Sequence, residues 1–143
     1  MSEAPSLDGM PFAELLDMEL VAVGEGTAVG RMPLTEAHTS NAETGVAHGG
    51  ATYALADTVG GAAVMSYTDV PTPTVDMRID YLAPATSDLR AEAELVRFGG
   101  SLALARVEVY DDDETHVATA HGTYKTGGSG GDTPWDSEGG HPG

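Results

Sequence analysis

The sequence predicts an α+β domain in which one long buried helix lies against an antiparallel sheet. Residues 48–67 (HGGATYALADTVGGAAVMSY) carry small and apolar side chains around nearly the whole helical circumference, which is typical of a helix buried on all sides. Two strand-like segments precede this helix and four follow it. A chain of 143 residues suffices for one such domain but not for two ordinary ones.

The first element expected is a short helix at residues 9–18, capped by Asp8, with an apolar face formed by Phe12, Leu15 and Leu16. A polar loop is expected over residues 34–45. In the long helix, glycines at 60 and 61 cost helix propensity, so we expect a packing reason for them, such as the close approach of another backbone.

The strands are expected, in order, at residues 20–23, 27–32, 75–82, 90–98, 101–110 and 115–125. In the third of these, strict alternation places Val75, Met77, Ile79 and Tyr81 on one face. The last three form a meander. The domain is expected to span residues 1–126, and the glycine-rich composition of residues 127–143 predicts a disordered tail.

The charge balance is strongly acidic, with 23 Asp and Glu against 6 Lys and Arg and a net charge of −17. Such a surface repels nucleic acids and anionic membranes, so neither is an expected partner. Salt screens the self-repulsion, which makes this composition suited to a salt-rich cytoplasm and predicts a halophilic protein. No signal peptide or membrane-spanning stretch is visible, so a cytoplasmic location is expected.

Asp57 is the only charged residue between His48 and Asp69, in the middle of the long helix. Burying an unpaired carboxylate costs several kcal/mol, so such a residue needs a partner or a chemical role. From this feature alone, a structural carboxylate and a catalytic one are equally good interpretations.

Gly49 and Gly50 follow His48 at the start of the same helix. Free backbone N–H groups and the positive end of the helix dipole lie there, and they could hold a carbonyl oxygen. A plain turn into the helix explains the glycines equally well, and His48 could simply cap the helix. A metal site is not expected, because the chain has no cysteine and its histidines lack ligand spacing.

The distance between these two features is informative. Asp57 lies nine residues after His48, which is about 13 Å along a helix. One chain therefore cannot easily bring its own Asp57 to a carbonyl held at its own Gly49. Two chains could do so if their helices ran antiparallel across a two-fold axis.

Four segments together resemble the phenylacetate-type (PaaI-like) branch of the hotdog thioesterases. They are HTSNAETGVAHGG at 38–50, ATYALADTVGGAA at 51–63, TVDMRIDYLAPA at 74–85 and RFGGSLALARVEV at 97–109. The resemblance covers roughly residues 10–126. It implies a hotdog fold, a long helix wrapped by a curved antiparallel sheet, in a homodimer or homotetramer with active sites at the dimer interface.

The activity implied by the resemblance is hydrolysis of an acyl-CoA thioester to a free acid and CoA. No separate cofactor is implied, since CoA is part of the substrate. Asp57 matches the catalytic carboxylate, a general base or nucleophile. Gly49 matches the residue whose N–H polarises the carbonyl, and His48 the histidine that supports this site.

Further positions match substrate-binding residues of the family: Asn41, Gly50 and Thr74. Gly100 stands where the family often has a basic residue, so Arg97 or Arg78 is expected to contact the CoA phosphates instead. Two alternatives stay open. One is a hotdog protein that binds acyl-CoA without turnover; the other is a hotdog dehydratase or hydratase. Asp57 and the HGG sequence favour the thioesterase.

Overall fold

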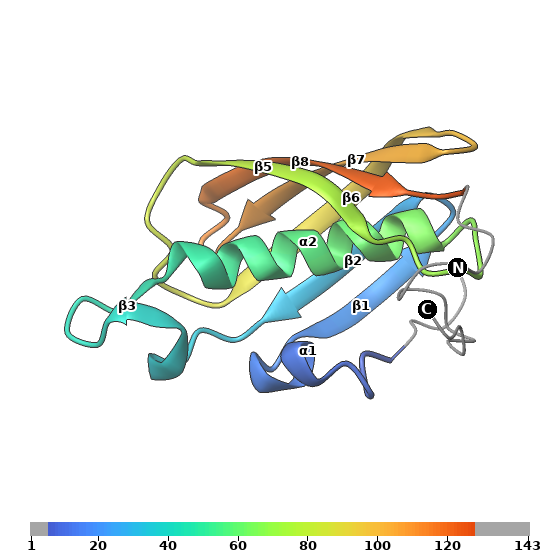
Figure 1. Cartoon of the computed structure of the whole chain (residues 1–143). Helices are drawn as coiled ribbons and strands as arrows, with labels where there is room; N and C mark the ends of the chain where they lie inside the picture. Colours follow the sequence, from blue (N-terminus) through green and yellow to red (C-terminus); the bar gives the residue numbers. More distant parts are fainter. Residues whose placement is uncertain (1–5, 128–143) are drawn as a thin grey trace.

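The structure is a computed structural model that describes residues 6–127 of the chain. The predicted tail lies outside the described residues except for Gly127, so the domain boundary stays a prediction. The elements, in order, are α1 (Pro11–Leu15), β1 (Glu19–Gly24), β2 (Thr27–Met32), the 3-10 helix η1 (Glu36–His38), β3 (Thr39–Asn41), β4 (Val46–Ala47), α2 (Gly49–Met65), β5 (Thr74–Tyr81), β6 (Leu89–Phe98), β7 (Leu102–Tyr110) and β8 (His116–Lys125) (Figure 1).

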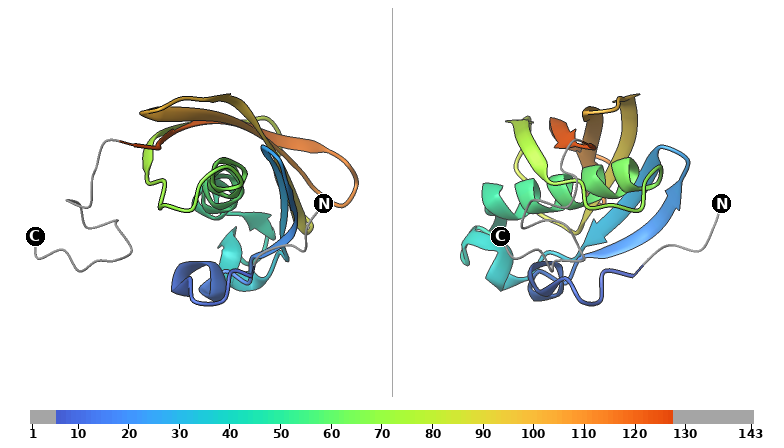
Figure 2. Two further views of the ribbon diagram at one scale, coloured as in Figure 1. Left: turned by 90° about the vertical axis from the view of Figure 1, so that its right-hand side faces the viewer. Right: turned by 45° about the vertical axis from the view of Figure 1, so that its right-hand side comes forward.

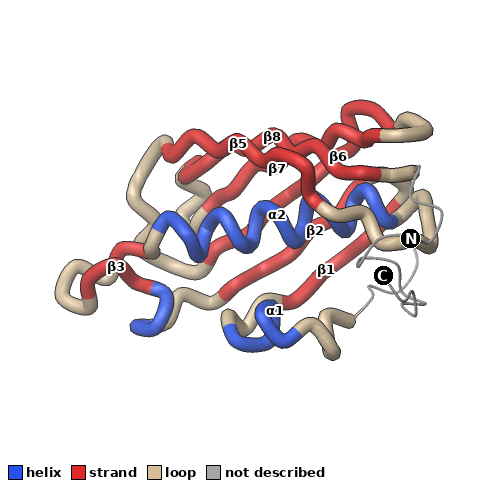
Figure 3. Tube along the Cα trace, viewed as in Figure 1, coloured by secondary structure: helices blue, strands red, loops and turns tan. Residues whose placement is uncertain are grey.

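One long helix and one large sheet dominate the molecule. Six strands form an antiparallel sheet in the order β1-β2-β6-β7-β8-β5, and β3 pairs with β4 in a separate ribbon. The sheet curves around α2, which is seen end-on in the left view of Figure 2 and in profile in Figure 3. The predicted α+β architecture of a long helix wrapped by a curved antiparallel sheet is therefore confirmed.

Small side chains let the helix lie close to the sheet. The buried inward-facing positions of the central strands are mostly alanine and valine: Ala91, Ala93, Ala103, Ala105, Val107, Val109, Ala118 and Ala120. On β2 the contact is closer still, since a Cβ added at Gly30 would lie 2.5 Å from Val59 Cγ2 of α2. This explains how a chain with 6% aromatic residues fills its core.

The prediction that the long helix is buried on all sides is wrong along one flank. Tyr53 and Met65 are exposed and Asp57 is half-buried, because the sheet ends at β5 and leaves that flank of α2 uncovered in a single chain. At Gly60 the expected close neighbour is also different. A Cβ there would lie 2.5 Å from the hydroxyl oxygen of Tyr124, so a side chain approaches the helix, not a backbone.

The N-terminal prediction also needs correction. Phe12 and Leu15 are 60% and 72% exposed, and Ala13 is the buried residue of α1. Asp8 does not cap this helix; Met10 holds the N-cap position without a side-chain bond, and Glu14 Oε2 accepts the N–H of Gly9 at 2.7 Å. A helix of five residues makes little more than one turn and can set only a narrow face against the rest of the protein. In α1 that face is Ala13, its smallest side chain.

The predicted loop at 34–45 contains η1 and β3, which pairs with β4 just before α2. His38, at the end of η1, is buried, and its carbonyl accepts the N–H of His48 at 2.7 Å. This segment therefore fixes the chain where it enters α2. None of the helices within residues 6–127 is long and apolar enough to span a membrane.

Candidate active site

The start of α2 offers one free backbone donor. His48 is the N-cap residue, and its Nδ1 accepts the N–H of Gly50 at 2.8 Å. Within the described residues, no hydrogen bond engages the N–H of Gly49. The positive end of the helix dipole lies at the same place. His48 thus uses the second N–H of the helix and leaves the first available to an acceptor from outside.

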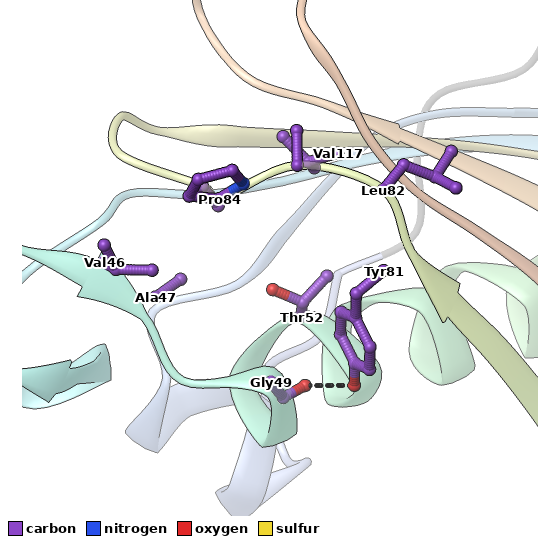
Figure 4. A pocket seen from close by; sticks show the side chains of 10 residues that line it. Val46, Ala47, Gly49, Thr52, Tyr81, Leu82, Pro84 and Val117 are labelled. Carbon is purple, nitrogen blue, oxygen red and sulfur yellow. Dashed lines mark hydrogen bonds between the residues drawn. The ribbon is translucent and has the colours of Figure 1, made fainter.

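Tyr81 of β5 covers this helix start. Its hydroxyl donates to the carbonyl oxygen of Gly49 at 2.7 Å (Figure 4). Burial, followed by the proximity of Tyr53, raises the pKa of Tyr81, so the hydroxyl keeps its proton. A Cβ added at Gly49 would lie 3.2 Å from Tyr81 Cζ, which explains why the smallest residue stands here.

A pocket of about 430 Å³ opens beside Gly49. Thr52 and Tyr81 contribute hydroxyl groups to it (Figure 4). The other lining residues are small or apolar: Val46, Ala47, Leu82, Ala83, Pro84, Ala85 and Val117. The pocket can therefore hold an uncharged, mostly apolar group next to the free N–H.

Asp57 lies half-buried on the uncovered flank of α2. Its Oδ1 accepts a hydrogen bond from Thr74 Oγ1 at 2.7 Å and one from the Tyr124 hydroxyl at 3.3 Å. The same hydroxyl lies 3.0 Å from the backbone oxygen of Asp57. The structure thus brings together Asp57 and Thr74, both predicted site residues, and adds Tyr124, which the sequence reasoning missed.

A β-bulge in β5 turns Thr74 toward the helix. Thr74 pairs with Tyr124 and Asp76 pairs with Thr123, so Val75 is an extra residue without a partner on β8. With strict alternation, Thr74 would face away from Met77 and from α2. Val75 is 58% exposed, so the prediction that it shares a face with Met77 is wrong, and the bulge is the reason.

The free N–H and the carboxylate do not meet within one chain. Gly49 and Asp57 are eight residues apart on α2, about 12 Å along the helix axis. Asp57 is not among the residues that line the pocket beside Gly49. One chain therefore holds two separate candidate half-sites, one at Gly49 and one at Asp57.

Two other predicted residues, Asn41 and Arg97, contact neither Gly49 nor Asp57 of their own chain. Asn41 is exposed, and its Oδ1 accepts the N–H of Glu43 at 2.8 Å, so its amide oxygen supports a local turn. Arg97 is exposed and pairs with Leu104 near the β6–β7 turn, which lies at the opposite end of α2 from Gly49 (Figure 1). The structure does not bring Arg97 to either half-site of its own chain.

Comparison with known proteins identifies the family. A model of the Thioesterase superfamily matches residues 44–118, which include α2 and most of the sheet. The chain belongs to this superfamily. The match includes Gly49, Asp57 and Thr74, whereas Tyr124 lies beyond it.

Three individual relatives of this thioesterase-superfamily protein span different lengths of the chain. A protein of Halobacterium salinarum named as an esterase is 35% identical over 106 residues, 66% of this chain and 70% of the relative. The medium/long-chain acyl-CoA thioesterase YigI of Salmonella typhimurium is 40% identical over 55 residues, 38% of this chain and 36% of YigI. The phenylacetic acid degradation protein PaaI of Thermus thermophilus, solved as a mutant, has a TM-score of 0.73 and 31% identity, covering 80% of this chain and 97% of that one.

These comparisons confirm the predicted hotdog fold and, through the family, an enzyme that hydrolyses thioesters. Sequence reasoning did not find Tyr81 and Tyr124. Both are tyrosines in strands, where an aromatic residue is ordinary, and only the pairing of β5 with β8 and the path of α2 bring their hydroxyls to Gly49 and Asp57.

Proposed function

We propose that this protein hydrolyses acyl-CoA thioesters at sites shared between two copies of the chain. In each site, Gly49 of one copy supplies the N–H and Asp57 of the other supplies the carboxylate. The observation that carries this proposal is the separation of about 12 Å between the two half-sites on one rigid helix. The acyl-CoA substrate class is supported by the activity of YigI and by the apolar pocket beside Gly49.

The edge strand β5 supports the dimer. It ends the described sheet, so its outer edge presents backbone N–H and C=O groups to which another strand can pair. We place a two-fold axis through the middle of β5, so that β5 pairs antiparallel with β5 of a second copy. Thr74 then lies opposite Tyr81 of the partner subunit. Thr74 contacts Asp57 and Tyr81 contacts Gly49, so this symmetry brings Asp57 toward Gly49 of the partner subunit.

The reaction then follows from the two half-sites. The thioester carbonyl oxygen accepts the N–H of Gly49 at the positive end of α2, which stabilises the negative charge that develops there. Asp57 takes a proton from water while the water oxygen bonds to the carbonyl carbon. The carbon–sulfur bond breaks, the CoA thiolate receives the proton from Asp57, and the carboxylic acid leaves. No cofactor enters this scheme.

Asp57 has a second possible route, attack of its own carboxylate on the carbonyl carbon to give an anhydride that water then opens. We favour the general base, because both hydroxyl contacts of the carboxylate fall on Oδ1 and so leave Oδ2 for a water molecule.

A shared site predicts that two inactive variants restore each other. Asp57→Asn removes the carboxylate, and Gly49→Pro removes the N–H. A mixed dimer of the two holds one intact site and one site that lacks both groups. Refolding an equal mixture produces mixed dimers as about half of all dimers, so about a quarter of wild-type activity should return.

Free-thiol release from octanoyl-CoA and benzoyl-CoA in about 2 M KCl, where charge repulsion is screened, provides the measurement. Asp112→Asn, an exposed carboxylate in the β7–β8 turn, is the matched control for charge. A mixture that stays inactive while each variant remains folded and dimeric would argue for a site within one chain.

The second candidate is a hotdog protein that binds acyl-CoA without turnover. It is favoured by Gly100 at the position where the family often has a basic residue, and by a net charge of −17, which repels the CoA phosphates at low salt. The free N–H of Gly49 and the hydrogen-bonded Asp57 favour catalysis. Ligand binding without thiol release from either probe would select the binding protein.

We also infer that the acidic composition is an adaptation to a salt-rich cytoplasm. The relative from Halobacterium salinarum and the net charge support this inference. Screening by molar salt would lower both the self-repulsion of the chain and its repulsion of CoA.

A further inference from the structure

We propose that Tyr124 is a positioning residue that fixes the orientation of the Asp57 carboxylate. This inference rests on the proposed function, in which Asp57 acts on water. Without this inference, Tyr124 would be only a buried core residue of β8.

The contact between Tyr124 and Asp57 is buried and close. Tyr124 is 1% exposed, yet its hydroxyl lies 3.0 Å from the backbone oxygen and 3.3 Å from Oδ1 of Asp57. A buried tyrosine hydroxyl needs a hydrogen-bond acceptor. In this chain both of its acceptors belong to the single charged residue of α2.

Two glycines make room for the tyrosine ring. A Cβ at Gly60 of α2 would lie 2.5 Å from the Tyr124 hydroxyl oxygen, and a Cβ at Gly122 of β8 would lie 2.8 Å from Tyr124 Cε1. Neither distance is compatible with a real side chain without displacement of the ring. The absence of both methyl groups therefore lets the hydroxyl reach Asp57, and it accounts for a glycine that costs helix propensity in α2.

Thr74 completes the arrangement from the neighbouring strand. Thr74 and Tyr124 are cross-strand partners, and their two hydroxyls contact the same oxygen, Oδ1 of Asp57. A carboxylate held at one oxygen by two donors cannot rotate freely. Its other oxygen, Oδ2, keeps a fixed direction and can serve as the proton acceptor for water.

The tyrosine can act only as a donor in this position. Burial, the negative charge of Asp57 and the hydrogen bond to it all raise the pKa of Tyr124, with a smaller effect from Tyr53. The hydroxyl therefore keeps its proton and can donate it to Asp57.

A purely structural role makes different predictions. The hydroxyl has one proton, and its shorter contact is to the backbone oxygen of Asp57. If this contact alone mattered, Tyr124 would tie β8 to α2, and its loss would lower stability without a separate effect on the Asp57 carboxylate or on turnover. The test must therefore separate folding from the state of the carboxylate.

Tyr124→Phe keeps the ring and removes the hydroxyl. We expect kcat on octanoyl-CoA or benzoyl-CoA to fall about 10- to 100-fold with KM within about twofold, the size of a lost hydrogen bond to a charged group. Tyr110→Phe, on the outer face of β7, is the matched control and should leave both unchanged.

Tyr124→Phe combined with Gly60→Ala fills the space left by the hydroxyl with a methyl group. We expect this double variant to recover thermal stability but not turnover. The ¹³C chemical shift of the Asp57 carboxyl group in the free enzyme adds a readout that does not depend on the substrate, and it should change in Tyr124→Phe but not in Tyr110→Phe. Recovery of turnover with stability, or an unchanged carboxyl chemical shift, would overturn the positioning role.

Asp57→Asn, measured in parallel, separates this inference from the proposed function. If Asp57→Asn loses turnover while Tyr124→Phe keeps the wild-type kcat, only the role of Tyr124 is wrong. If Asp57→Asn itself keeps wild-type turnover, Asp57 is not the catalytic group and both proposals fail.

Discussion

Replacing Gly49 by proline removes the free N–H at the start of α2 while preserving the helix. Gly49 is the first helical residue, a position where proline is well tolerated because the missing N–H has no partner inside the helix. The preceding residue also suits proline, since His48 has φ −64° and ψ 138°, an extended conformation. The substitution therefore acts on one hydrogen-bond donor with little cost to the backbone.

The magnitude follows from what the donor does. Loss of one preorganised oxyanion donor typically lowers kcat by about 10² to 10³, or about 2.7–4 kcal/mol of transition-state stabilisation. Crowding is a separate effect, because a Cβ at this position lies 3.2 Å from Tyr81 Cζ. Gly49→Ala introduces the same Cβ and keeps the N–H, so it measures the crowding alone.

The assay is thiol release from octanoyl-CoA and benzoyl-CoA in about 2 M KCl, with circular dichroism and thermal unfolding to verify the fold. We expect Gly49→Pro to lose at least about 30-fold more kcat than Gly49→Ala, close to the range for one oxyanion donor. If the two folded variants differ by less than about threefold, the N–H of Gly49 does not hold the carbonyl, and this part of the mechanism is refuted.

Four other results are expected. The unfolding midpoint should rise between about 0.1 M and about 2 M KCl, because the screening length falls from about 10 Å toward 3 Å or less, and a flat response would contradict salt adaptation. Hydrogen bonds and charge from Arg90 lower the pKa of Glu114 from its ordinary value, so the contribution of this pair to stability is present above the ordinary value and is lost as pH falls through the lowered pKa. Arg90→Gln should therefore show a weaker loss of stability on acidification. A single turnover in H₂¹⁸O with excess enzyme should label every product molecule if Asp57 is a base, whereas unlabelled first product would indicate an anhydride opened at the Asp57 carbon. Gly30→Ala should destabilise the fold by about 1–3 kcal/mol in urea unfolding, and a double-mutant cycle with Val59→Ala should show coupling, because the added Cβ lies 2.5 Å from Val59 Cγ2.

Patterns that depend on local periodicity predicted most of the fold. The long helix predicted at residues 48–67 lies at Gly49–Met65, and the strand predicted at residues 90–98 is β6 at Leu89–Phe98. The burial of α2 could not be read in the same way. A helix with small residues on every side is compatible with burial by its own sheet or by a second chain, and the sequence does not distinguish the two.

The candidate site shows a similar division. Asp57 and Gly49 were visible because a lone carboxylate and a glycine pair are unusual in a helix. The hydroxyl of Tyr124 was not visible, because its contact with Asp57 depends on the register between β5 and β8. Register is set by pairing between distant segments, so composition and periodicity within either segment carry no signal of it.

The bulge at Val75 makes the length of β5 as important as its composition. Without this residue, β5 would pair with β8 in unbroken alternation. In one case, Thr74 would face away from the helix and lose its hydrogen bond to Asp57. In the other case, Met77, Ile79 and Tyr81 would turn to the opposite face, and Tyr81 would lose its hydrogen bond to Gly49. A deletion of one residue would thus affect both half-sites although it touches neither. Variants of this enzyme should therefore tolerate changes in the side chain at position 75 far better than any change in the number of residues between Thr74 and Tyr81.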